Sequence, residues 1–245
     1  MGYGLWAMDL LIKGSSELNQ MFAALERTAA GLRRDFSEVE NLQQTITGAR
    51  DFVAHAGMRI EGMILDDLTL VRPNAGVLTP TVSRDGDGIS EFVLALSGAA
   101  NFVRGNPNFA ISLALRQNDE TKIGLVYAPI DDRLYYAESG AGAYLFNAYH
   151  STKIHVSKQK EPRDLMIGFD AESGQGANMR PYAKRITGCA ALDLAFVAAG
   201  KFDAFVSAPL DFAEIAAGAL LVAEAGGQLT ETAGTLVVSN GIVNM

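Results

Sequence analysis

The sequence predicts a layered fold of mixed α and β structure, α/β overall with an α+β first half. Two helical patterns open the chain, a run of short strands with turns follows, and strands alternate with helices beyond Lys158. Strands joined by short turns are typical of an antiparallel meander, and alternating strands and helices are typical of α/β structure. We therefore expect subdomains at residues 15–158 and 159–245, joined in one compact unit.

Two amphipathic helices are expected before the first strand. Apolar residues at three-four spacing predict a helix that begins at a serine cap, Ser15 or Ser16, and ends near Phe36. A second apolar stripe predicts a helix over Met58–Val71, which the following Pro-Asn pair ends. Residues 79–88 are rich in turn formers and should be a surface loop.

The remaining elements follow from the same patterns. Strands are expected at Phe92–Leu96, Ala110–Leu115, Ile123–Ala128, Arg133–Glu138, Tyr144–Phe146, Leu165–Phe169, Phe202–Val206, Gln228–Thr230 and Leu236–Val238. Helices are expected at Ala190–Ala199 and Phe212–Ala225, with a short helix or turn at Asn101–Phe109.

Composition excludes several classes of protein. The 245 residues are 49% hydrophobic and 20% charged, which is typical of a globular protein, and the net charge of −8 argues against a broad nucleic-acid surface. No apolar run is long enough to cross a membrane. The single cysteine, Cys189, excludes an internal disulfide and favours a reducing, cytoplasmic location.

A motif in the middle of the chain carries a family resemblance. Residues 101–115 read NFVRGNPNFAISLAL, which is similar to a run of the inositol monophosphatase family. Further matches occur in order: GLVYAP at 124–129, TGCAALDLA at 187–195, IAAG at 215–218 and EAGG at 224–227. Arg34-Asp35-Phe36 and Glu38-Val39-Glu40 resemble the bacterial extragenic-suppressor (SuhB-like) branch.

The resemblance implies a five-layer αβαβα sandwich that hydrolyses phosphate monoesters with two or three magnesium ions. It also implies a homodimer, and the SuhB-like branch implies a regulatory role in transcription and RNA processing through protein contacts. The segment between Phe169 and Lys184 is shorter than the family's usual helix-bearing stretch.

The chain departs from the family at the positions that hold the metal ions and the attacking water. His55 also stands where an acid is usual. The residues aligned with the metal and water positions are Gly57, Pro80, Thr81, Leu94, Ser97, Ala99 and Glu214.

These residues do not supply what magnesium requires. Magnesium takes hard oxygen ligands in near-octahedral order, and metal-bound hydroxide is the nucleophile in this kind of hydrolysis. Glu214 is the sole acid left at the aligned positions. We therefore expect no catalytic residues, no metal and no cofactor.

Two sets of residues could still bind a ligand. The backbone N–H groups of Gly98, Ala99 and Ala100 could bind an anion without metal, because N–H groups at a helix start attract negative charge. Residues on the substrate side of the family cleft align with Gly188, Cys189, Ala190 and Ser207. For Cys189, a small buried residue is the favoured interpretation over a reactive thiol.

Other clusters of metal-ligand type have simpler explanations. Asp85, Asp87 and Glu91 lie in RDGDGISE, which does not meet the spacing of a calcium loop and is interpreted as a polar loop. His150 and His155 lack nearby ligands and are interpreted as solvent-facing strand residues.

Two functions remain. The favoured hypothesis is a catalytically silent protein, a pseudoenzyme, that acts by binding a regulatory protein partner or a ligand. The alternative is a working magnesium-dependent phosphatase on inositol 1-phosphate or a related sugar or nucleotide phosphate. It would have to hold magnesium with Glu214, Asp193, Asp211 and backbone carbonyls.

Overall fold

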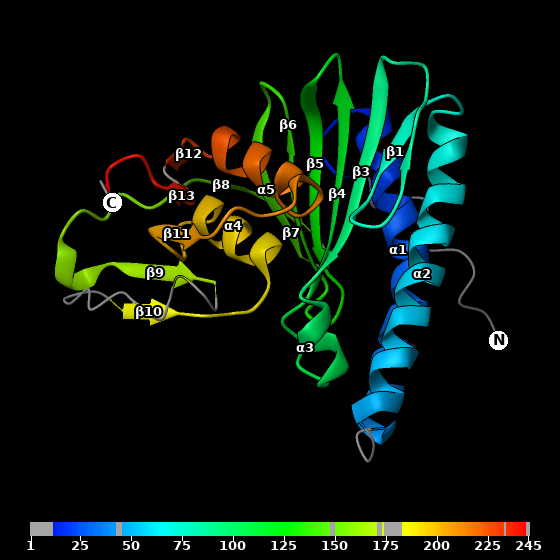
Figure 1. The fold of residues 1–245 in the computed structure, drawn as a ribbon. Helices are drawn as coiled ribbons and strands as arrows, with labels where there is room; N and C mark the ends of the chain where they lie inside the picture. Colours follow the sequence, from blue (N-terminus) through cyan, green and yellow to red (C-terminus); the bar gives the residue numbers. More distant parts are fainter. Residues whose placement is uncertain are drawn as a thin grey trace.

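The structure, a computed structural model, describes residues 12–42, 46–147, 150–170, 173, 183–232 and 234–243. Within these residues the fold has four layers, in the order helices, sheet, helices, sheet (Figure 1). This is the mixed, layered α/β fold that the sequence predicts. The stretch between Phe169 and Lys184, from which a fifth layer would come, lies mostly outside the described residues.

Helices α1 (Ser16–Leu42) and α2 (Ile46–Val71) form the first layer and pack side by side against one face of the larger sheet (Figure 1). The hydroxyl of Ser15 accepts a hydrogen bond from the backbone N–H of Leu18, so the predicted serine cap is confirmed.

Both helices are longer than the sequence patterns predict. The predicted end near Phe36 is wrong, because the buried stripe of α1 continues to Val39 and the helix runs to Leu42. The predicted start at Met58 is also wrong, since α2 begins twelve residues earlier, at Ile46. Gly48 and the few large apolar residues of this first part weaken the periodic signal on which the prediction depends.

The larger sheet has eight strands in the order β2-β1-β3-β4-β5-β6-β7-β8. Its strands are β1 (Gly76–Leu78), β2 (Ser83–Arg84), β3 (Ser90–Ser97), β4 (Ala110–Gln117), β5 (Glu120–Ala128), β6 (Arg133–Glu138), β7 (Gly142–Asn147) and β8 (His150–Ile154). All neighbours from β3 to β8 are antiparallel, which confirms the predicted meander. Strands β1, β2 and β8 are additions, and β2 lies inside the predicted loop 79–88.

Helices α4 (Ala190–Ala198) and α5 (Phe212–Glu224) form the third layer, close to their predicted bounds. The second sheet has the order β10-β9-β11-β13-β12. Its strands are β9 (Met166–Phe169), β10 (Ala183–Arg185), β11 (Ala204–Ser207), β12 (Gln228–Thr232) and β13 (Thr235–Ser239), with a 3-10 turn at Pro162–Asp164. The short helix α3 (Ala99–Val103) follows β3.

The larger sheet is buried on both faces. Leu94, Leu113 and Tyr136 pack with α1 and α2, whereas Val93, Val126 and Tyr135 pack with α4 and α5. Among the described residues, no helix combines the length and the apolar content that crossing a membrane requires.

Candidate functional site

The end of strand β3 holds two of the positions that the family resemblance aligns with metal ligands. Leu94 and Ser97 are both buried, at 3% and 1% exposure, and the strand is regular through Ser97. Because side chains alternate along a strand, the two residues lie on opposite faces of the sheet. Leu94 packs in the core under α2, and Ser97 faces α4.

The Ser97 side chain is already engaged. Its Oγ accepts a hydrogen bond of 3.3 Å from the backbone N–H of Ala191, in the first turn of α4. The thiol of Cys189 donates to the Ser97 carbonyl at 3.4 Å. These two contacts join the end of β3 to the N-terminus of α4.

Gly98 and Asn101 strengthen this junction. Gly98 has φ of 82°, and a Cβ there would lie 2.8 Å from the Asn108 carbonyl and 3.0 Å from the Cβ of Cys189. Only glycine fits this turn without strain. The Asn101 side-chain N–H₂ donates to the carbonyls of Thr187, at 2.8 Å, and Asn108, at 2.6 Å.

The anion-binding candidates are close to solvent. Ala99 and Ala100 are exposed and start α3, which has five residues, and Gly98 precedes them in the left-handed conformation. The Gly98 carbonyl accepts hydrogen bonds from the N–H groups of Asn101 and Phe102.

Cys189 behaves as a buried residue, as the sequence interpretation favours. Burial raises the pKa of its thiol to about 12, and the nearby carboxyl groups of Asp193 and Glu214 add to the effect. The thiolate is therefore disfavoured at neutral pH. Of its neighbours among the substrate-side candidates, Gly188 is exposed and Ala190 is half-buried.

Asp193, on α4, is a buried carboxyl group with an incomplete set of hydrogen-bond partners among the described residues. Its Oδ2 accepts a 2.8 Å hydrogen bond from the Thr187 hydroxyl, but its Oδ1 is buried with no partner in the described part of the chain. Burial raises the pKa of this carboxyl to about 7. The hydroxyl of Ser207, on β11, is likewise buried without a described partner. An aspartate inside an otherwise apolar helix, six residues after a threonine, is the sequence signal for this group.

Glu214 and Asp211 lie at the start of α5. The Oδ1 of Asp211 accepts from the Ala213 N–H at 2.8 Å, so this carboxylate caps the helix. Burial, and then the charge of Asp211, raises the pKa of Glu214. Ser112 on β4 approaches the carbonyls of Ala213 and Glu214 at 3.5 Å, which places Glu214 beside the middle of the larger sheet.

The remaining aligned positions lie on α2 and after β1. Gly57 faces the sheet, where a Cβ would meet only Leu96, at 3.9 Å. Pro80 and Thr81 are exposed in a turn in which the Thr79 hydroxyl accepts from the N–H groups of Thr81 and Val82. His55, also on α2, is exposed.

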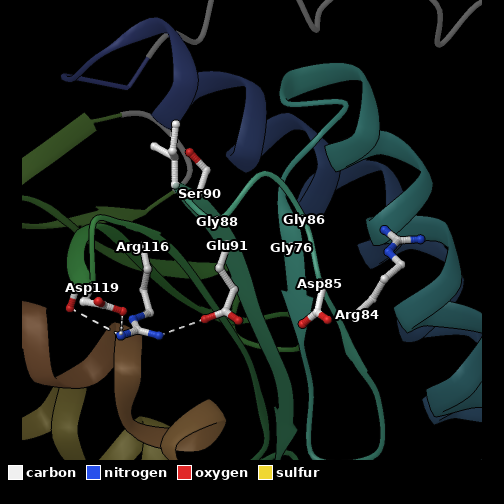
Figure 2. Close-up of a pocket in the computed structure, with 10 residues that line it drawn as sticks. Gly76, Arg84, Asp85, Gly86, Gly88, Ser90, Glu91, Arg116 and Asp119 are labelled. Atoms are coloured by element: carbon white, nitrogen blue, oxygen red, sulfur yellow. Dashed lines mark hydrogen bonds and ion pairs between the residues drawn. The ribbon is translucent and has the colours of Figure 1, made fainter.

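A separate polar cavity of about 310 Å³ lies at the opposite end of β3 (Figure 2). Arg116 bonds to Glu91 at 2.8 Å and approaches Asp119 at 3.3 Å, so these charges are largely compensated. Asp87, nearby, accepts hydrogen bonds from the N–H groups of Ile89 and Ser90, as expected of a polar loop.

No group of three or more histidine, cysteine, aspartate or glutamate side chains is arranged for a metal ion within the described residues. His150 and His155 are both exposed, as predicted, but only His150 lies in a strand, because β8 ends at Ile154.

Comparison with known proteins places this layered fold in a family. The model of the inositol monophosphatase family matches residues 15–244. An inositol-1-monophosphatase from Rhizobium meliloti is 35% identical over 235 residues, covering 90% of this chain and 87% of that protein. The chain therefore belongs to the inositol monophosphatase family.

Relatives of the SuhB type are also similar. A Nus factor SuhB from Xylella fastidiosa is 30% identical over 230 residues, covering 89% of this chain and 82% of that protein. The crystal structure of the extragenic suppressor protein SuhB from Bartonella henselae superimposes with a TM-score of 0.80 at 30% identity, covering 94% and 95% of the two chains.

Proposed function

We propose that this protein is a catalytically silent member of the inositol monophosphatase family that acts by binding. The observation that carries the proposal is how the side chains at the end of β3 are used. Leu94 is part of the apolar core, and Ser97 uses its hydroxyl to bind the N-terminus of α4. Neither side chain is available to hold a cation.

The side chains at the aligned positions do not fit a pair of magnesium ions. Magnesium needs near-octahedral oxygen ligands at about 2.0–2.1 Å, of which carboxylates are the usual protein part. One carboxylate, Glu214, is present, Leu94 offers no oxygen, and the Ser97 hydroxyl accepts a hydrogen bond from Ala191. Without a cation to stabilise the transferring phosphoryl group and activate water, the cleft has no means of hydrolysis.

Binding of an anion does not require the metal. Backbone N–H groups at Gly98, Ala99 and Ala100 are independent of the side chains that differ from the family, and their residues are half-buried or exposed. We therefore retain weak phosphate binding at this loop as part of the proposal. Titration with inorganic phosphate, followed by amide NMR, should shift these three signals, and unchanged signals would remove this part.

The relatives support a regulatory role. Several are named Nus factor SuhB, at 28–30% identity. We propose that this chain is a cytoplasmic homodimer that binds a regulatory protein partner. Light scattering tests the oligomeric state, because a monomer at micromolar concentration would contradict the homodimer.

A second candidate function is a working magnesium-dependent phosphatase. Relatives named inositol-1-monophosphatase, 34–35% identical, favour it. In this candidate Glu214, Asp193 and Asp211 would have to hold magnesium with backbone carbonyls. The contacts of two of these residues weigh against it, since Asp211 caps α5 and Asp193 is bonded to Thr187.

A phosphatase assay decides between the two. Inositol 1-phosphate and magnesium are supplied, and the Rhizobium meliloti relative is assayed in parallel as a control. We expect no turnover above background and no heat of magnesium binding in titration calorimetry. Turnover of about 1 per second or more, the ordinary range for enzymes, would establish the phosphatase.

A further inference from the structure

A small apolar cavity of about 60 Å³ lies between α2 and the larger sheet, beside Leu94. Helix α2 contributes positions at helical spacing, and the sheet contributes aliphatic side chains from β3 and β4. The lining residues are Gly57, Ile60, Glu61, Ile64, Leu94, Ala95, Leu96 and Ile111. Among the aliphatic residues Ile60, Ile64, Leu94 and Ile111 are at most 4% exposed, so core residues form the floor of the cavity, whereas Gly57, Glu61 and Leu96 are half-buried and leave it partly open to solvent.

The cavity exists because position 57 carries no side chain. A Cβ on Gly57 would meet only Leu96 Cδ2, at the ordinary contact distance of 3.9 Å. A cavity of roughly 10–15 Å³ holds one water molecule, so this one has room for about four to six groups of that size. An aliphatic lining offers water few partners, whereas a short alkyl group fits both its size and its chemistry.

One charged group lines the cavity. Glu61 lies one turn after Gly57 on α2, is half-buried, and makes no hydrogen bond or ion pair with the described part of the chain. An unpaired carboxylate beside an apolar cavity favours a ligand with a positive charge next to its hydrocarbon part.

We propose that this cavity binds a small aliphatic amine, with its branched alkyl group among Ile60, Ile64 and Leu94 and its ammonium at Glu61. The inference rests on the proposed function, because it assigns a ligand class to a cleft that no longer holds magnesium. A metal cluster and an alkyl group cannot share the space beside Leu94. In this chain an apolar cavity lined by Gly57 and Leu94 therefore lies at positions that the resemblance aligns with a charged, oxygen-rich site.

Three probes of one shape test the ligand class. Isobutylamine, isobutanol and isobutyrate are titrated into the full-length protein, and the methyl signals of the isoleucines are followed by NMR. We expect isobutylamine to shift the signals of Ile60, Ile64 and Ile111 and to leave Ile154, which lies in another core cluster, unchanged. Isobutanol should bind several-fold more weakly, and isobutyrate should not bind.

Matched variants test the location. Gly57→Leu should fill the cavity and weaken isobutylamine binding at least tenfold, with Gly57→Ala intermediate. Gly62→Leu is the control, because Gly62 lies on the same helix with open space around it and gains the same helix propensity. Binding by this control should stay within twofold of the wild type. Glu61→Gln should abolish the preference for the amine over the alcohol.

The results that would contradict the amine site differ from those that would contradict the proposed function. Unshifted isoleucine signals, equal binding of isobutyrate, or unimpaired binding by Gly57→Leu would each overturn the amine site. Magnesium-dependent hydrolysis of inositol 1-phosphate by the wild type would instead overturn the catalytically silent function. The two measurements use different readouts and can be made on the same sample.

Discussion

The carboxyl group of Asp193 is buried in the fold, where its charged form is disfavoured. The residue is 1% exposed, the Thr187 hydroxyl is the one hydrogen-bond partner of its side chain among the described residues, and burial raises its pKa from 3.8 to about 7. The folded state thus binds this proton more tightly than the unfolded state does. The stability that this group contributes is complete below about pH 4 and is lost as the pH rises through 7.

Asp193→Asn should remove this pH dependence. A shift of about 3 pKa units corresponds to at most about 4 kcal/mol. The free energy of unfolding of the variant, minus that of the wild type, should therefore rise by up to this amount between pH 4.5 and pH 8. Urea denaturation at four pH values measures the difference. A difference that stays constant would show that Asp193 does not titrate in this range.

Ser97 should be a stabilising residue in its own right. Ser97→Ala leaves the buried N–H of Ala191 without its acceptor, which costs about 1–3 kcal/mol. Ser112→Ala is the matched control, because Ser112 is equally buried and its contacts, at 3.5 Å, are at the limit of a hydrogen bond. Chemical denaturation should rank Ser97→Ala as clearly the less stable variant. Equal stability of the two would contradict the junction between β3 and α4.

At the candidate site, the sequence predicts which residues stand at the family's positions but not how they are used. The interpretation of Cys189 as a small buried residue is confirmed, since its side chain is 1% exposed. The placement of Leu94 and Ser97 on opposite faces depends on how far β3 continues, and the bond from Ala191 to Ser97 joins residues 94 positions apart. Such contacts are set by tertiary packing, which local patterns do not contain.

At the level of elements, the nine predicted strands and the two later helices are found, whereas the lengths of α1 and α2 and the short strands β1, β2, β8 and β10 are not predicted. Helices α4 and α5 are short, apolar and bounded by turn residues, so pattern and structure agree within one residue at each end. Helix α2 begins with a stretch in which Gly48 and small residues dilute the apolar stripe. Its first part is helical because it extends from a packed segment, and periodicity alone does not reveal this.

Two glycines within helices should respond to alanine in opposite directions. Gly62 on α2 has open space around it, so Gly62→Ala should stabilise the protein by about 1 kcal/mol through helix propensity. Gly218 on α5 faces α4, where a Cβ would lie 2.6 Å from the Cβ of Leu194. Gly218→Ala should cost about 1–3 kcal/mol, because it forces the two helices apart. Thermal denaturation measures both, and stabilisation by Gly218→Ala would contradict the close packing of α4 on α5.

At the scale of the whole molecule, helices α4 and α5 join the two halves of the chain through a shared core. They come from residues after 158, yet they cover a face of the larger sheet that is formed by residues before 158. Val93, Ala95, Val126 and Tyr135 on that face are at most 2% exposed, in one apolar cluster with Leu194 and Phe205. Neither half closes this core alone, so the boundary between 15–158 and 159–245 should not separate two independently stable domains.

The whole protein should accordingly unfold in one transition. Calorimetry should give a single peak with equal calorimetric and van't Hoff enthalpies, because loss of either half exposes the shared core. A fragment of residues 15–158 should fail to fold, since one face of its sheet would lie open to water, and its circular dichroism should lack a cooperative melt. Mixing it with the fragment 159–245 should restore part of that melt. Two resolved transitions, or a cooperative melt of the first fragment alone, would mean that its sheet is stable without α4 and α5.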